Sequence, residues 1–98
     1  MNINTPLTEG LEWMKYCWCL NGWEKEPKSH SEAYKSIEAI LSNKGTVYDY
    51  SMLIEWTEPR TAGEISVHMK TKLSDDWSSA KKLIDINNLL KEHLRLTK

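Results

Sequence analysis

The chain of 98 residues contains no phenylalanine, two cysteines and four scattered glycines. It therefore has neither a G-x-G-x-x-G fingerprint nor a P-loop, which excludes the two common glycine-rich phosphate-binding loops. No apolar stretch approaches the ~18 residues of a membrane-spanning helix, and the first ten residues lack the cationic start and apolar run of a signal peptide. These absences predict a cytoplasmic protein that does not associate with a membrane.

A large net charge is also missing, because 13 basic and 14 acidic residues give a formal charge of −1. The whole-protein field therefore gives no reason to expect a polyanionic partner. The charges are unevenly distributed, however. Residues 1–58 carry five Lys or Arg against nine Asp or Glu, a balance of −4, and residues 59–98 carry eight against five, a balance of +3. This mild asymmetry is weak support for a basic face in the C-terminal part.

Tryptophan and tyrosine supply the aromatic residues, with five and four copies respectively. Both combine a large apolar area with a polar group, which suits half-buried positions and binding surfaces. The length predicts one domain, residues 1–98, in which residues 1–5 form a flexible N-terminus. A chain of this size needs neither a metal nor a disulfide to fold, and two cysteines in an unexported chain are expected to be reduced thiols.

Two segments predict amphipathic helices. Ser74, followed by two acids, marks the start of a helix that runs to about Leu96. Residues 29–45 predict the other helix, which begins with a capping box formed by Ser29 and Glu32. The stripe of the C-terminal helix consists of Ala80, Leu83, Ile86, Leu90 and Leu94.

Two further segments, residues 47–56 and 63–73, alternate apolar and polar side chains with period two. This pattern is typical of half-buried strands, and Pro59 and Gly63 between the two segments indicate a loop. The alternating apolar residues are Tyr48, Tyr50, Met52, Ile54 and Trp56 in the first segment and Ile65, Val67, Met69 and Leu73 in the second. The sequence here predicts a β-hairpin.

Residues 6–26 fit two interpretations. Asn21-Gly22 between alternating residues is the strongest short hairpin signal, and Tyr, Cys and Trp are poor helix formers. Alternatively, Thr5-Pro6 starts a helix that Asn21-Gly22 ends, with Leu7, Leu11, Met14 and Trp18 as its stripe. We favour the hairpin, which predicts an α+β fold of order ββαββα, an antiparallel sheet covered by two helices. The helical alternative gives the order ααββα.

Cys17 and Cys19 are the residues that raise the question of a chemical site. Zinc sites usually space paired cysteines by two to four residues and need four ligands, whereas here the spacer is one residue and the histidines stand alone. A catalytic pair of either thiol with His68 is expected by chance from two cysteines and three histidines. We therefore predict that the protein is not an enzyme and has no metal or cofactor.

Protein binding is the predicted function, because Trp, Tyr and Arg most often anchor interfaces. We expect a small non-enzymatic module of the inhibitor, antitoxin, immunity or adaptor type. Trp23 beside the turn, Trp77 at a helix start, and Arg60 and Pro59 on the hairpin tip are the candidate contact residues. For the two tryptophans, an equally good interpretation is that they close the ends of the core.

The alternative function is a nucleic-acid-binding regulator that uses the Lys-rich C-terminal half. Its candidate residues are Lys70, Lys72, Lys81, Lys82, Lys91 and Arg95. A solvated basic helix edge explains these residues better, so nucleic acid ranks second as a partner. The identity of the protein partner stays open, and so does the oligomeric state, a homodimer included.

Overall fold

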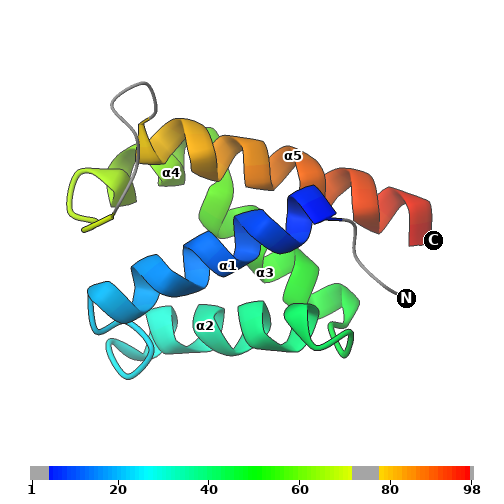
Figure 1. Ribbon diagram of the computed structural model, residues 1–98, viewed down its shortest axis with the longest axis horizontal. Helices are drawn as coiled ribbons and strands as arrows, with labels where there is room; N and C mark the ends of the chain where they lie inside the picture. Colours follow the sequence, from blue (N-terminus) through cyan, green and yellow to red (C-terminus); the bar gives the residue numbers. More distant parts are fainter. Residues whose placement is uncertain (1–4, 72–77, 98) are drawn as a thin grey trace.

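The computed structural model describes residues 5–71 and 78–97, and within these ranges the chain forms five α-helices and no strand (Figure 1). The helices are α1 (Thr5–Leu20), α2 (Lys28–Leu41), α3 (Val47–Thr57), α4 (Pro59–Ser66) and α5 (Ser79–Thr97). The predicted α+β fold is therefore wrong in both of its orders, ββαββα and ααββα. Of the predicted flexible N-terminus, residues 1–5, only Thr5 is among the described residues, and it begins α1.

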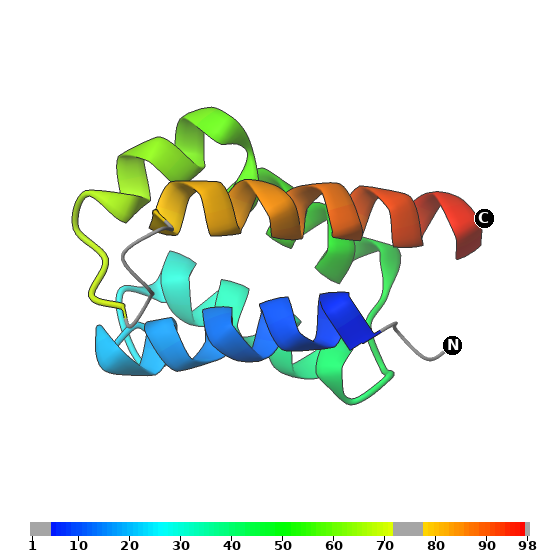
Figure 2. The same ribbon diagram turned by 45° about the horizontal axis from the view of Figure 1, so that its top comes forward.

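Four of the helices form a closed ring of packed neighbours. Helix α1 packs against α2 and α5, and α3 packs against the same two helices, while the short α4 lies on α3 and α5. In Figures 1 and 2, α1 runs in the opposite direction to α5. One end of the molecule therefore collects the end of α1 and the starts of α2 and α5. The other end collects the start of α1 and the ends of α2 and α5.

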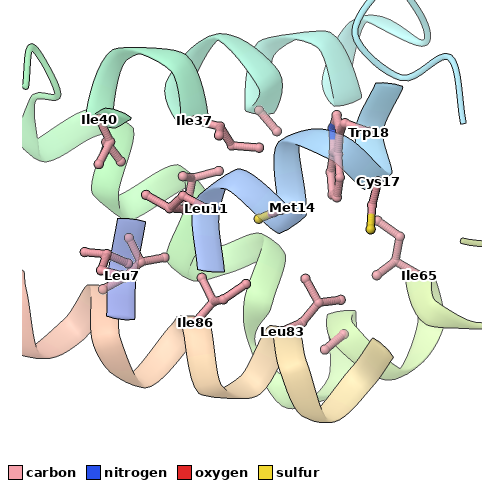
Figure 3. Packing of buried hydrophobic residues seen from close by; sticks show 14 of the residues in the cluster. Leu7, Leu11, Met14, Cys17, Trp18, Ile37, Ile40, Ile65, Leu83 and Ile86 are labelled. Atoms are coloured by element: carbon pink, nitrogen blue, oxygen red, sulfur yellow. The ribbon is translucent and has the colours of Figure 1, made fainter. Parts of the chain in front are cut away.

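One hydrophobic core lies between these helices (Figure 3). Each helix contributes residues spaced three or four apart, which lie on one helical face. Its members include Leu7, Leu11, Met14, Trp18, Ile37, Ile40, Leu53, Ile65, Leu83, Ile86 and Leu90. Helix α1 approaches α5 closely at Gly10, since a Cβ at this position would lie 2.9 Å from Cγ1 of Ile86. The missing side chain thus permits the close packing of these two helices.

The hairpin interpretation of residues 6–26 is wrong, and its helical alternative is right, because all four residues of the predicted stripe are buried in α1. The Asn21-Gly22 pair ends this helix. Gly22 has a φ of 72°, and the Trp23 N–H donates to the carbonyl of Trp18 at 2.8 Å, as in a helix-terminating Schellman turn. The Asn21 side chain also exchanges two hydrogen bonds with the backbone of Lys70. The dipeptide therefore both stops α1 and holds the chain that follows α4.

The first predicted strand is in fact helix α3. Thr46 caps it, since its hydroxyl accepts from the Asp49 N–H, while the Asp49 carboxylate accepts from the Thr46 N–H at 2.8 Å. The buried residues Tyr50, Leu53 and Thr57 follow helical spacing. In a strand, Leu53 would lie on the polar face, yet it is 0% exposed. The capping box and the buried Leu53 explain why the period-two pattern failed.

The second predicted strand and the loop before it are also wrong. Pro59 takes the first position of α4, where its missing N–H breaks no intrahelical bond, and Gly63 lies inside the same helix. Ile65 and Met69 are buried, but Val67, which the strand would place on the same face, is 77% exposed. The apolar alternation therefore does not correspond to one buried face.

Both predicted helices are present. Helix α2 starts one residue before Ser29, with Pro27 in the cap position and no side-chain cap hydrogen bond, so the predicted box of Ser29 and Glu32 does not cap it. Helix α5 is described from Ser79. Its predicted start at Ser74 lies outside the described residues. The predicted amphipathic stripe of α5 is buried at its three central positions, Leu83, Ile86 and Leu90.

Candidate binding site at the tryptophan end

Four aromatic rings meet where the end of α1, the start of α2 and the end of α3 come together. The rings, here called the Trp cluster, belong to Trp18, Trp23, His30 and Trp56. The centroid of Trp18 lies 5.0 Å from that of Trp23 and 5.7 Å from that of Trp56, both edge to face. His30 lies 4.8 Å from Trp23 and 4.7 Å from Trp56. Such ring pairs contribute about 0.5–1.5 kcal/mol each beyond the area they bury.

Trp18 is the fixed centre of this cluster. It is fully buried, and its indole N–H donates to the backbone carbonyl of His30 at 2.9 Å, which joins α1 to the first turn of α2. Trp23, His30 and Trp56 are half-buried and pack around it. The buried indole therefore holds three rings that each keep an exposed part.

A pocket of about 260 Å³ lies beside the exposed parts of these rings. Its lining residues are Trp23, His30, Trp56, Thr61, Glu64, Ile65 and His68. A neighbouring hollow of about 300 Å³ shares Trp56 and Thr61 with the pocket and adds Glu55. Cofactor and drug-sized sites usually enclose about 300–1,000 Å³, so the pocket by itself is slightly smaller than such sites and has room for a single side chain.

The walls of the two hollows carry negative charge. Among their described lining residues there are two carboxylates, Glu55 and Glu64, and neither lysine nor arginine. Burial lowers the pKa of His30, which favours the neutral imidazole. Glu64 forms an ion pair with Arg60, Nε to Oε1 3.4 Å, but both side chains are mostly exposed. Exposed pairs of this i,i+4 kind contribute about 0.3–0.5 kcal/mol, so Arg60 is a weakly held counter-ion.

The structure separates the four residues that the sequence suggested for protein binding. Trp23 lines the pocket and also packs on the Trp cluster, so part of its ring is covered by the core and part stays exposed. Pro59 and Arg60 are exposed, but they lie in the first turn of α4 instead of on a hairpin tip. Trp77 lies outside the described residues.

Sequence reasoning missed the other walls of the pocket. Trp56 was assigned to the covered face of a strand, and His30 and Glu64 were not considered for binding. The capping box that begins at Thr46 is the signal that predicts a helix here, and a helix places Trp56 three residues after the buried Leu53, at the edge of the stripe. No local signal marks His30, because the rings that it contacts lie elsewhere in the chain.

The described basic residues of the nucleic-acid alternative are interspersed with acids. Lys91 is paired with Glu58, Nζ to Oε1 3.1 Å, and this hydrogen bond lowers the pKa of Glu58. Lys70 follows α4, Lys82 lies on another side of α5, and Lys72 is outside the described residues. One row of α5 at helical spacing reads Lys81, Asp85, Asn88, Glu92 and Arg95. Two acids, Asp85 and Glu92, lie between the bases at the two ends of that row, so it is not a basic stripe.

The two cysteines lie on different sides of α1. Cys17 is buried, its thiol donates to Thr71 Oγ1 at 3.2 Å, and burial raises the pKa of this thiol. Cys19 is exposed, with its sulfur 3.7 Å from the hydroxyl oxygen of Tyr34. Within residues 5–71 and 78–97, no group of three or more His, Cys, Asp or Glu is arranged to hold a metal ion. The two thiols thus have separate surroundings.

A third hollow of comparable size, about 290 Å³, lies at the opposite end of the molecule. Here the Tyr50 ring stacks on His93 with centroids 5.3 Å apart, and the pKa of Tyr50 is raised by burial and by the nearby Asp49. The lining residues are Asn43, Gly45, Thr46, Val47, Tyr50, His93 and Leu94. We call this region the Tyr50 end. Its described lining contains neither tryptophan nor a carboxylate.

Comparison of the chain with protein-family models, with curated proteins and with solved structures gave no match. The geometry of the Trp cluster and its pocket is therefore the basis for inferring a function. None of the described helices combines the length and the hydropathy that crossing a membrane requires.

Proposed function

We propose that the protein is a small non-enzymatic module that binds another protein through its tryptophan end. The observation that carries this proposal is the pocket of about 260 Å³ between the half-buried Trp23 and Trp56, both packed against the buried Trp18. Tryptophans in well-packed, partly exposed positions are the residues that most often dominate binding energy. Rings that are already held in place also lose little conformational freedom when a partner docks.

The size and charge of the surface favour a protein partner over the alternatives. A pocket below the usual cofactor range accepts one side chain, which is how a protein partner places an anchor residue. Nucleic acid is favoured by neither region, because carboxylates flank the pocket and acids lie among the bases of α5. A binding module that presents this surface to a partner accounts for both features.

Site-specific crosslinking tests the proposal directly. A photoreactive amino acid replaces His68, an exposed residue of the pocket lining, and a matched variant carries it at Glu92, an exposed residue in the C-terminal half of α5. Both proteins are irradiated in lysate of cells that make the protein, with and without nuclease. We expect a protein crosslinked from position 68, unaffected by nuclease, and absent from position 92.

Two outcomes would contradict the proposal. Equal crosslinking from both positions would mean that the tryptophan end is not the contact surface. Nucleic acid recovered with the protein, together with loss of all crosslinks on nuclease treatment, would favour the nucleic-acid alternative instead. Circular dichroism of both variants before irradiation verifies that each is folded.

A further inference from the structure

Trp56 shares each of two hollows with one carboxylate. It lines both hollows, one of which adds Glu64 and the other Glu55, and both of these acids are exposed. A cation over the face of a tryptophan ring is attracted by the ring's quadrupole, and an adjacent carboxylate adds a direct charge interaction. The site thus combines two kinds of group that attract positive charge.

The other residues of the pocket also favour a positively charged guest. Trp23 adds a second indole, and burial lowers the pKa of His30, which favours its uncharged form. Trp23, His30, Glu55 and Trp56 all come from residues 1–58, which carry five basic against nine acidic residues. Arg60 does not line either hollow, and it is tied to Glu64 by an exposed pair that another cation can displace.

We propose that the pocket beside Trp56 receives a basic side chain, arginine or lysine, that projects from the partner protein. This deepens the proposed function and rests on it. The indole faces of Trp23 and Trp56 cover the aliphatic stem and the cation, and Glu55 and Glu64 neutralise the charge at the mouth. An acidic guest would meet like charge from both carboxylates, and an apolar guest would gain no charge interaction with them.

The test uses a single side chain as the probe. Acetyl-arginine methylamide is titrated into the full-length protein at low salt and about pH 8, where free imidazole is neutral. Acetyl-citrulline methylamide, in which a neutral urea replaces the guanidinium, is the matched probe. The indole N–H signals of Trp23 and Trp56, assigned from Trp→Phe variants, report binding by NMR, and the signal of Trp13 on α1 is the internal reference.

We expect arginine to bind about three- to tenfold more tightly than citrulline, from one cation–π contact and exposed charge pairs. The double variant Glu55→Gln and Glu64→Gln should abolish this preference, whereas Glu12→Gln on α1 removes an acid outside both hollows and should keep it. Arg60→Gln should tighten arginine binding, because it removes the competing cation. A structural role alone would not produce opposite effects from Arg60 and its partner Glu64.

Equal affinity for arginine and citrulline, or equal shifts at Trp13, would overturn the inference. Such a result combined with specific crosslinking from position 68 would leave the protein-binding function intact and reject only the basic guest. Loss of the crosslink itself would reject the proposed function whatever the titration gives.

Discussion

The two ends of the bundle carry hollows of similar size but of different construction. At the tryptophan end, rings from α1, α2 and α3 pack on one another, and carboxylates from α3 and α4 stand beside them. At the Tyr50 end, one stacked pair, Tyr50 and His93, lies against the backbone of the connection between α2 and α3. Volume therefore does not distinguish the two. The two ends differ in their walls: the tryptophan end has several packed aromatic rings together with carboxylates, and the described walls of the Tyr50 end have one stacked pair and no carboxylate.

This difference shows how a small helical protein concentrates chemistry at one end. Among the described residues, the tryptophan end alone places a fully buried indole behind its pocket, so the stability of the core and the shape of the surface depend on the same residue there. At the Tyr50 end, Val47 and Tyr48 are largely exposed, and neither is among the residues packed on the core. Substitutions should therefore affect the two ends unequally.

The largest expected effect comes from Trp18→Ala. It removes the buried indole and its hydrogen bond, and should lower the free energy of unfolding by about 3–5 kcal/mol, as for other buried aromatic residues. His93→Ala at the Tyr50 end removes one side of a stacked pair and should lower it by about 1–2 kcal/mol. Urea unfolding followed by far-ultraviolet circular dichroism measures both values. Equal losses from the two variants would remove the proposed distinction between the ends.

Two glycines give changes of opposite sign at the two ends. A Cβ at Gly45, which lines the hollow of the Tyr50 end, would lie 2.5 Å from Cγ1 and 3.1 Å from Cα of Ile40, so Gly45→Ala should destabilise by about 1–3 kcal/mol. A Cβ at Gly63 in α4 would meet nothing within 4 Å, so Gly63→Ala should stabilise by about 0.5–1 kcal/mol. Thermal melts in one buffer measure both. A gain of stability from Gly45→Ala would show that this end adapts more easily than its packing indicates.

The smallest expected effect is a dependence of stability on pH at the tryptophan end. Burial lowers the pKa of His30 in the folded protein below its ordinary value of 6.5. The unfolded chain then binds more protons than the folded one, so the contribution of His30 to stability falls as the pH drops from about 6.5 through the folded pKa. Unfolding free energies at several pH values should show a shallower slope for His30→Gln. This variant keeps the backbone carbonyl that accepts from Trp18, and an unchanged slope would contradict the prediction.

The sequence contained more of the fold than the period-two pattern suggested. The signals at Thr46 and Asp49 for a helix start, and at Pro59 for a first helical position, are both local and both correct for helices. Leu53, on the wrong face for a strand, also favours a helix. The alternation of apolar residues was misleading, because a helix with a wide apolar face also has apolar residues two positions apart. The two clear amphipathic helices were predictable, since their stripes have no such ambiguity.

The candidate site was less predictable. Trp23 was accessible to sequence reasoning because it follows a turn, and a rich supply of tryptophan indicated a binding surface. The pocket itself depends on His30, Trp56 and Glu64 from three different helices, and no spacing in the chain relates them. Its composition follows from the way α2, α3 and α4 meet, which is a property of tertiary packing alone.

The geometry of the Trp cluster also has an optical consequence. Centroid separations of 5.0 and 5.7 Å, with ring planes at 78° and 81°, bring the indoles of Trp18, Trp23 and Trp56 into van der Waals range. The electronic transitions of indole rings couple at such distances, so these three residues contribute a coupled signal to the near-ultraviolet dichroism. That part of the dichroism of the native protein therefore reports on the Trp cluster without any added label.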